Sequence, residues 1–222
     1  MLNWLKIICL LSFIILISCK PVKNEIQTVS ISNKEINQDS ISKDTVIIDS
    51  QYTFEEAIAG SKAPIEIIKQ LELIDVQYYS TDEKLHKGQI LTNKVLATDL
   101  KEIFRFILKS KFTIEHAIPV VKYKWFDDLS MQDNNTYSFC YRNEAFSKHA
   151  TGMAIDINPF FNPVRWKEGS EYRQDKPEEA HRDTTVNGTF YVSHPVVQEF
   201  KNHGFLWGHD FKAKCDDHHF EK

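Results

Sequence analysis

Beyond residue 50, hydrophobic positions recur with helical spacing in some segments and alternate in others, which is typical of an α+β domain. Between Asn93 and Lys111 the apolar residues follow one helical face, and Asn93 or Thr92 can cap the start of that helix. A second amphipathic helix is expected over 195–203, where Gly204 marks its end. Two short helices are expected over 54–59 and 64–71, and strands over 76–79, 89–91 and 112–123. The pattern therefore predicts one α+β domain over residues 51–222.

A strand with a polar face is predicted from Ala154 to Asn158. Its two isoleucines share one face, which we assign to the core, and Asp156 lies on the other face. His149 would lie on the opposite face of a fully extended chain, so a bend at Gly152 is needed to bring imidazole and carboxylate together. Zinc binds both of these groups. A buried His–Asp pair without a metal would explain the same residues.

The sequence CDDHHFE at the C-terminus offers further ligands. In a strand, His219 and Glu221 share one face. Asp216 lies three residues before His219, where a turn of the chain could place its carboxylate beside the metal ligands. A catalytic zinc site combines three protein ligands with a nearby carboxylate that takes a proton from water. By position alone, His218 could replace His219 as the ligand and Asp217 could replace Asp216 as the carboxylate.

Composition and charge limit the classes of partner. Of 222 residues, 42% are hydrophobic and 26% are charged, which excludes a collagen-like or wholly disordered chain. The formal net charge of −4 gives no basic footprint, so we expect no nucleic-acid partner.

The N-terminus has the pattern of an export signal. Lys6 precedes an apolar stretch that is too short to cross a bilayer, which predicts a signal peptide over residues 1–18. The sequence Leu-Ile-Ser-Cys ending at Cys19 resembles the lipobox of bacterial lipoproteins, which implies a lipid on Cys19. An ordinary secretion signal or an anchor helix is the alternative. Residues 19–50 are predicted to form a flexible tether, although residues 45–48 could be a strand.

Two cysteines, Cys140 and Cys215, remain in the predicted domain. In an oxidising compartment they could form a disulfide, but sequence does not show whether they are close. A disulfide and two buried thiols both stay open.

Two motifs together resemble one known family. SKHATGMAID, ending at Asp156, fits S-x-H-x-x-G-x-A-x-D, and DDHHFE, ending at Glu221, fits D-x-x-H-F-E. These motifs resemble the VanY-type zinc D-alanyl-D-alanine carboxypeptidases and L-alanyl-D-glutamate endopeptidases, which share the hedgehog/DD-peptidase fold. The resemblance spans about residues 64–221 and implies a central antiparallel sheet flanked by helices. His209 departs from the family's usual glycine, which affects the rim of the cleft.

The resemblance implies a role for each residue of the metal centre. His149, Asp156 and His219 would hold Zn²⁺. Asp216 would act as general base and then as acid, taking a proton from water and delivering it to the leaving amine.

Four further residues are expected around that centre. The resemblance implies that Arg142 holds the substrate carboxylate or the oxyanion, a role that suits its forked donor. Ser147 is expected to orient substrate or to cap its loop. Glu221 is expected to orient a metal ligand, with a solvated charge as the alternative. Asn158 is expected to be either a donor behind the ligands or a turn residue.

The resulting expectation is a lipid-anchored zinc metallopeptidase of the cell envelope, facing the periplasm or the exterior. Its substrates would be peptidoglycan stem peptides, its membrane contact a lipid anchor, and its state a monomer. Removal of terminal D-Ala and cleavage after L-Ala both stay open, although the segment NNTYSFCYR and the D-x-x-H spacing resemble the endopeptidases somewhat more closely. The alternative is a non-catalytic cell-wall-binding lipoprotein that uses the same zinc fold.

Overall fold

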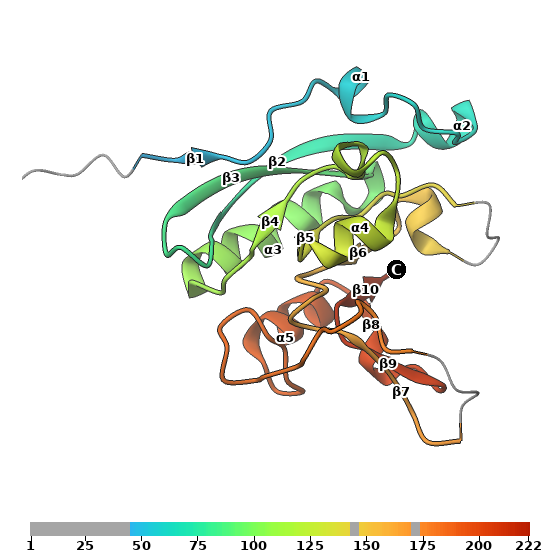
Figure 1. Ribbon diagram of the computed structural model, residues 1–222. Helices are drawn as coiled ribbons and strands as arrows, with labels where there is room; N and C mark the ends of the chain where they lie inside the picture. The colour runs from blue at the N-terminus through green and yellow to red at the C-terminus, as the bar shows by residue number, and fades with distance from the viewer. Residues whose placement is uncertain (1–44, 143–146, 170–173) are drawn as a thin grey trace, which may run out of the picture. The chain divides into compact units, whose positions relative to one another are not determined.

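The computed structural model describes residues 45–142, 147–169 and 174–222 (Figure 1). The predicted signal peptide, Cys19 and the tether up to residue 44 lie outside these ranges. In the described ranges, no helix is long and apolar enough to cross a membrane.

A long antiparallel hairpin forms the first sheet. Strand β2 (Leu71–Tyr79) pairs along its whole length with β3 (Leu85–Asn93). Strand β1 (Ile47–Ile48) adds to β3 in parallel, so these two residues form a strand instead of a tether. The short helices α1 (Phe54–Ala57) and α2 (Ile65–Ile68) follow β1 in the chain and lie above the hairpin in Figure 1.

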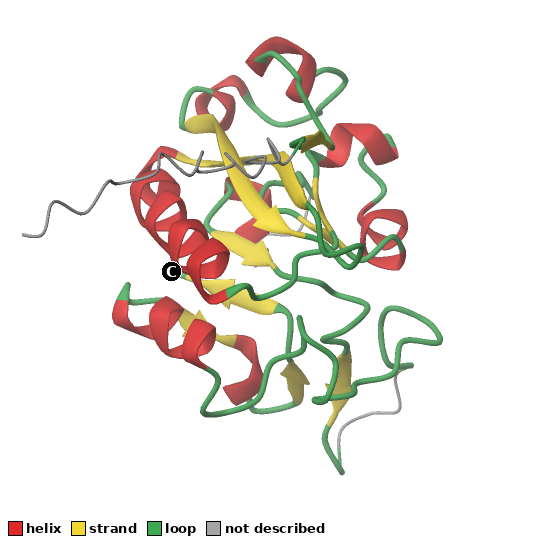
Figure 2. Ribbon diagram, turned by 90° about the vertical axis from the view of Figure 1, so that its left-hand side faces the viewer, coloured by secondary structure: helices red, strands yellow, loops and turns green. Residues whose placement is uncertain are grey.

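Two helices cover one side of the domain, and both confirm the hydrophobic pattern. Helix α3 (Lys94–Ser110) begins after Asn93, whose side chain accepts a hydrogen bond from the amide of Val95 at 3.1 Å. Helix α5 (Pro195–Asn202) ends before Gly204, which has a φ of 81°. The two helices contact each other and lie on the same side of the sheets (Figure 2).

The prediction of a strand over residues 112–123 is wrong for most of this segment. Only β4 (His116–Ala117) is extended there, and a 3₁₀ helix follows at Val120–Tyr123. Pro119 precedes this helix with a φ of −55° and has no N–H to donate to a neighbouring strand, so the chain leaves the sheet at this point. Helix α4 (Asp127–Gln132) then leads to β5 (Asn135–Thr136), which pairs with β4.

The C-terminal half brings distant segments into one small sheet. Strand β10 (His219–Glu221) lies between β6 (Ala154–Asp156) and β8 (Leu206–Trp207). A separate pair is formed by β7 (Val164–Trp166) and β9 (Lys214–Asp216). Further 3₁₀ turns occupy Lys148–Thr151 and Gly208–Asp210.

The α+β class is confirmed, but the single central sheet is not. Strands in the described ranges form two three-stranded and two two-stranded sheets. Short bridges connect them: Tyr137 pairs with Asp156, and the amide of Phe139 donates to Leu91 at 2.9 Å. Both halves contribute to one core, in which Ile155 and Phe220 are fully buried.

Candidate metal centre

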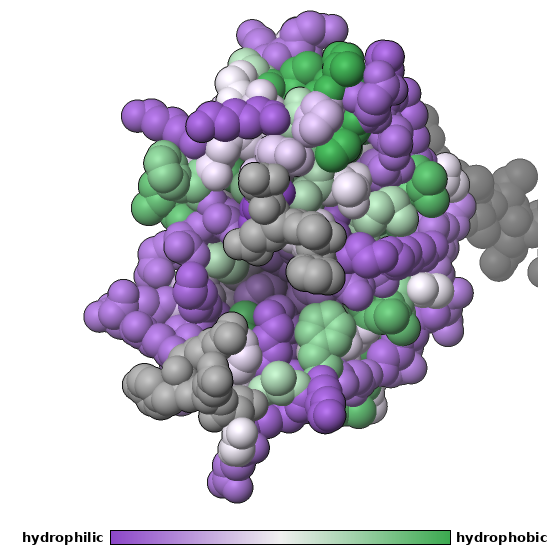
Figure 3. All heavy atoms as spheres, turned by 90° about the vertical axis from the view of Figure 1, so that its right-hand side faces the viewer, coloured by the Kyte–Doolittle hydropathy of each residue, from purple (hydrophilic) through white to green (hydrophobic). Residues whose placement is uncertain are grey.

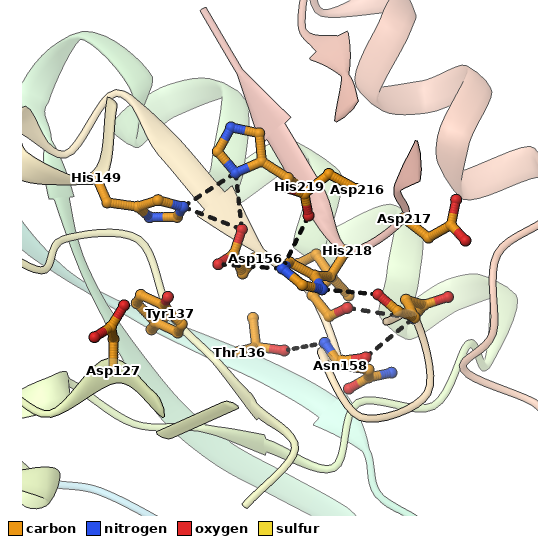
Figure 4. A network of polar contacts seen from close by, with 12 residues as sticks. Asp127, Thr136, Tyr137, His149, Asp156, Asn158, Asp216, Asp217, His218 and His219 are labelled. Atoms are coloured by element: carbon orange, nitrogen blue, oxygen red, sulfur yellow. Dashed lines mark hydrogen bonds and ion pairs between the residues drawn. The ribbon is translucent and has the colours of Figure 1, made fainter. Parts of the chain in front are cut away.

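Three side chains from separate segments meet at one point (Figure 4). The register of β10 and β6 sets His219 directly opposite Asp156, and His149 approaches from the 3₁₀ turn before β6. Oδ1 of Asp156 lies 3.1 Å from Nε2 of His149 and 3.0 Å from Nδ1 of His219. The two imidazole nitrogens are 3.1 Å apart. The residues that the resemblance implies as ligands therefore converge.

The position of His149 depends on the bend at Gly152. Gly152 has a φ of 69°, and a Cβ there would lie 2.7 Å from the amide nitrogen of Asn93. Behind the ring, Nδ1 of His149 donates to the carbonyl of Ser138 at 2.7 Å. A carbonyl only accepts, so Nε2 is the atom left to face Asp156.

A contact at Nε2, the nitrogen that does not face Asp156, orients the ring of His219. Its Nε2 lies 3.0 Å from Oε2 of Glu221, two residues along the same strand. That contact leaves Nδ1 directed toward Asp156. Glu221 thus occupies the place of a carboxylate behind a metal-binding histidine, a common partner of zinc ligands.

The three atoms fit the ligand set of a zinc ion. Two imidazole nitrogens and one carboxylate oxygen are typical zinc ligands, and a tetrahedral site with bonds of about 2.0–2.1 Å has ligand–ligand edges of about 3.3 Å. The observed separations of 3.0–3.1 Å are close to that edge. Zinc would be held by His149, Asp156 and His219, with a fourth position toward the cavity.

Without a metal, the cluster holds a proton. Burial alone would lower the pKa of His219, but hydrogen bonds to Asp156 and Glu221 outweigh it and raise that pKa to about 10. Burial would raise the pKa of Asp156, but the histidines around it, His149 and His218, hold it well below its ordinary value. The carboxylate is therefore ionised at neutral pH, and His219 carries a proton that a metal would displace.

Asp216, at the end of β9, lines the same cavity as the three ligands. Its Oδ2 pairs with Nζ of Lys214 at 2.7 Å, and its Oδ1 lies 3.0 Å from Nε2 of His218. The second contact has an ion-pair distance but not hydrogen-bond geometry. Burial would raise the pKa of Asp216, yet these cations, with His219, lower it. The carboxylate is thus ionised and can accept a proton.

The cavity beside the cluster has a volume of about 620 Å³ and is also lined by Arg142 and Ser147. Nη2 of Arg142 pairs with Asp127 at 2.6 Å and donates to the hydroxyl of Tyr137 at 3.3 Å. Its buried Nε has no hydrogen-bond partner among the residues described. Figure 3 shows a hollow bordered mainly by hydrophilic side chains on the face seen there.

A family model described as D-alanyl-D-alanine carboxypeptidase matches residues 141–222. The match covers the C-terminal part of the chain, which is similar to this peptidase family. The matched segment contains the three candidate ligands, Asp216 and Arg142, whereas Asp127 and Tyr137, which contact Arg142, precede it. Searches of curated proteins and of solved structures returned no significant match.

Within the matched segment, Asn158 lies away from the candidate metal ligands. Its side chain donates to the carbonyls of Thr113 and Gly188 at 2.7 and 3.1 Å and accepts from the amide of Glu115 at 3.0 Å. These bonds join three loops, and the backbone of Asn158 has a φ of 45°. Of the two roles expected for Asn158, the structure shows that of a turn residue and not that of a donor behind the ligands.

The alternative carboxylate, Asp217, points away from the cavity. Its Oδ2 accepts from Arg165 at 2.8 Å and lies 3.2 Å from Arg182, and its Oδ1 is 2.6 Å from Nδ1 of His209. His209, Cys215 and Asp217 also lie within reach of a common ion. Because two guanidinium groups already neutralise Asp217, a second metal is disfavoured there.

His209 packs against an aromatic ring, and of the two alternatives left open for the cysteines the structure shows free thiols. The ring of His209 stacks on Trp207, with centroids 4.4 Å apart. In the described part of the chain, Cys140 and Cys215 are both free thiols, so the structure shows no disulfide between them. Cys140 is buried and lies 3.7 Å from the carbonyl of Trp125.

Two contact residues of the site went unnoticed in the sequence. Lys214 pairs with Asp216, and a signal existed, because residues two apart in a strand share a face. Asp127 pairs with Arg142 from a helix that precedes it by a whole strand, and no local pattern indicates such a contact.

Proposed function

We propose that this domain is a zinc-dependent peptidase that hydrolyses peptidoglycan stem peptides. The observation that carries the proposal is the convergence of His149, Asp156 and His219 beside Asp216 in one cavity. A structural zinc site is closed by four protein ligands, whereas a catalytic site keeps one position open and has a base nearby. Three candidate ligands with one carboxylate nearby are what the second kind of site requires, and the match of residues 141–222 to a peptidase family supports this proposal.

The chemistry follows from the groups that line the cavity. Bound zinc would polarise the scissile carbonyl and lower the pKa of a water molecule to about 7. Asp216 would accept the proton of that water and deliver it to the leaving amine. Lys214 holds one oxygen of Asp216, which keeps the carboxylate ionised before the reaction.

Arg142 is proposed to bind the carboxylate of the substrate. Its Nε is a buried donor without a partner among the described residues, and a substrate carboxylate would satisfy it. Asp127 fixes the other end of the guanidinium group at 2.6 Å. Ser147 lines the same cavity and is proposed to orient the peptide.

Two cleavages fit this site. A D-alanyl-D-alanine carboxypeptidase binds a terminal carboxylate, and an L-alanyl-D-glutamate endopeptidase binds a side-chain or α-carboxylate inside the stem. Arg142 can serve either purpose, because both substrates present a carboxylate near the scissile bond. The family description favours the first.

The proposed location is the cell envelope, with the enzyme anchored by a lipid on Cys19. This part of the proposal rests on the N-terminal sequence pattern. A segment between Cys19 and β1 would let a membrane-bound domain reach a polymer outside the membrane.

The test uses residues 42–222, which form one compact unit. The protein is incubated with purified muropeptides, with zinc or with a chelator, and products are identified by mass spectrometry. Chelator-sensitive loss of terminal D-Ala identifies a carboxypeptidase, and release of the stem after L-Ala identifies an endopeptidase. The matched control is Asp216→Asn, which retains the metal ligands. A folded, zinc-loaded protein that gives no product would contradict the proposal and favour a wall-binding module.

A further inference from the structure

His218 is a buried residue of the site that the mechanism above leaves without a role. It lies between the proposed base and a proposed ligand, with 3% of its surface exposed. Its Nε2 is 3.0 Å from Oδ1 of Asp216 and 3.8 Å from Oδ2 of Asp156 (Figure 4). One imidazole nitrogen thus faces two carboxylates.

The other side of the ring fixes which nitrogen faces the carboxylates. Nδ1 of His218 donates to the carbonyl of Asn162 at 2.7 Å. The loop that carries this carbonyl is itself held, because the side chain of Asn162 is buried and accepts a hydrogen bond from the amide of Phe190 at 2.7 Å. The ring therefore has a rigid support, and its Nε2 stands at a fixed place between Asp216 and Asp156.

The two oxygens of Asp156 have different neighbours. Oδ1 meets both proposed histidine ligands, His149 and His219, at 3.1 and 3.0 Å. Oδ2 faces His218. A metal-binding carboxylate is commonly held through its second oxygen, and such a contact decides which oxygen faces the metal.

We propose that His218 is a positioning residue that sets Asp216 at a fixed place relative to the metal-facing oxygen of Asp156. The inference rests on the proposed function, because it assigns Asp216 as the base and Asp156 as a ligand. It adds a residue that lines the same cavity and acts through the two carboxylates. The shorter contact, to Asp216, is expected to carry more of the effect than the longer one, to Asp156.

Two substitutions of His218 distinguish the contribution of Nδ1 from that of Nε2. His218→Asn keeps an amide donor near the place of Nδ1 and removes the group that faces the carboxylates. His218→Gln places its amide donor near Nε2 instead. His86 provides a matched control, since it is also buried between two carboxylates, those of Asp49 and Asp82, at 2.8 and 3.1 Å. Its neighbours belong to the first sheet, so His86→Asn should leave catalysis unchanged.

The measurement is kcat and KM on a muropeptide substrate, with zinc content and melting temperature, for the full chain purified in detergent. For His218→Asn we expect kcat to fall by about 10–100-fold with KM within about twofold of wild type. His218→Gln should recover kcat to within about threefold of wild type. His86→Asn should lower the melting temperature and leave kcat unchanged.

Other outcomes would overturn the inference. A wild-type kcat in His218→Asn would show that the contact with Asp216 does not matter. Equal losses of kcat in His218→Asn and His218→Gln, with lowered melting temperatures, would show that the ring only fills space. If His218→Asn does not fold, His218→Gln decides: a kcat near wild type supports the inference and a lost kcat overturns it.

A readout without catalysis separates this inference from the proposed function. Zinc affinity is measured by competition with a chromophoric chelator, and the longer contact with Asp156 predicts a loss of up to about tenfold in His218→Asn, restored in His218→Gln. If the wild-type protein hydrolyses nothing but shows this pattern, the proposed function fails and the positioning of Asp156 stands. Equal affinities in all three proteins would overturn the role toward Asp156.

Discussion

Among the described residues, two buried histidines, His86 and His218, each lie between two aspartates, and they differ in what surrounds them. His86 joins Asp49 to Asp82 at the start of the first sheet, and the hydroxyl of Tyr78 also donates to Asp49. His218 lies between Asp216 and Asp156 beside the cavity. Both arrangements use the same residue types, but the contacts of His86 are 2.8 and 3.1 Å long and those of His218 are 3.0 and 3.8 Å.

The two arrangements differ in where the oxygen atoms of the aspartates are directed. Around His86, both oxygens of Asp49 approach Nδ1, at 2.8 and 3.0 Å, so the pair forms a closed contact that fixes β1 beside β3. Around His218, one oxygen of Asp156 is directed instead at two further imidazoles beside a cavity. A metal requires several ligand atoms directed at one point, so only the second arrangement suits one.

The largest expected effect is on the metal. His149→Ala should abolish stoichiometric zinc binding, because two remaining ligands do not hold a catalytic zinc ion. Metal content after dialysis, measured by mass spectrometry, checks this. Asp49→Ala is the matched change in the first sheet and should keep one zinc per chain. A full complement of zinc in His149→Ala would exclude this residue as a ligand.

The next largest effect is on turnover. Asp216→Asn should lower kcat by about 10²–10⁴-fold, since it removes the proposed proton acceptor while the three ligands remain. Steady-state kinetics on the muropeptide substrate measure the loss, and zinc content is the control. Turnover that stays at the wild-type level with zinc bound would assign the base to another residue.

A change in the first sheet should act on stability instead. Asp49→Ala leaves His86 and Tyr78 without their shared acceptor, and a buried donor left without a partner costs about 1–3 kcal/mol. Urea unfolding of the zinc-loaded protein measures this loss, and kcat at a temperature where the variant is folded should be unchanged. A lowered kcat in the folded variant would remove the distinction between the two regions.

The smallest expected effect is the change of stability and zinc affinity with pH. The pKa of His219 is raised to about 10 in the metal-free protein, from about 6.5 in an unfolded chain. The stability that its proton contributes is therefore complete below about pH 6.5 and is lost as the pH rises through about 10. Zinc must displace this proton, so zinc affinity should rise by about tenfold per pH unit between pH 7 and 9.

Titration calorimetry in buffers of different ionisation enthalpy measures the protons released. Release of about one proton from His219 per zinc at pH 7 is expected. Glu221→Gln should reduce the number, because it removes one of the two carboxylates that raise the pKa of His219. A zinc affinity that does not change with pH would show that His219 is neutral before the metal binds.

Much of the local structure could be predicted from the sequence. The helix after Asn93 was predictable because capping and the periodicity of its apolar face are local properties. The strand 112–123 was not, since its β-branched residues outweighed one proline in the pattern, whereas Pro119 decided the backbone. β-propensity is judged over many residues together, whereas the missing N–H of one proline removes a hydrogen bond of the sheet at a single position.

The candidate site divides in the same way. The sequence by itself determined the residue types, the spacing of the two motifs and the bend at Gly152, because each depends on a few consecutive residues. Only the tertiary structure decided that Asp217 turns to Arg165 and Arg182, and that Asp216 and His218 face the cavity. Neighbouring aspartates have equal chemistry, and what distinguishes them is which cations distant segments place within a few ångströms.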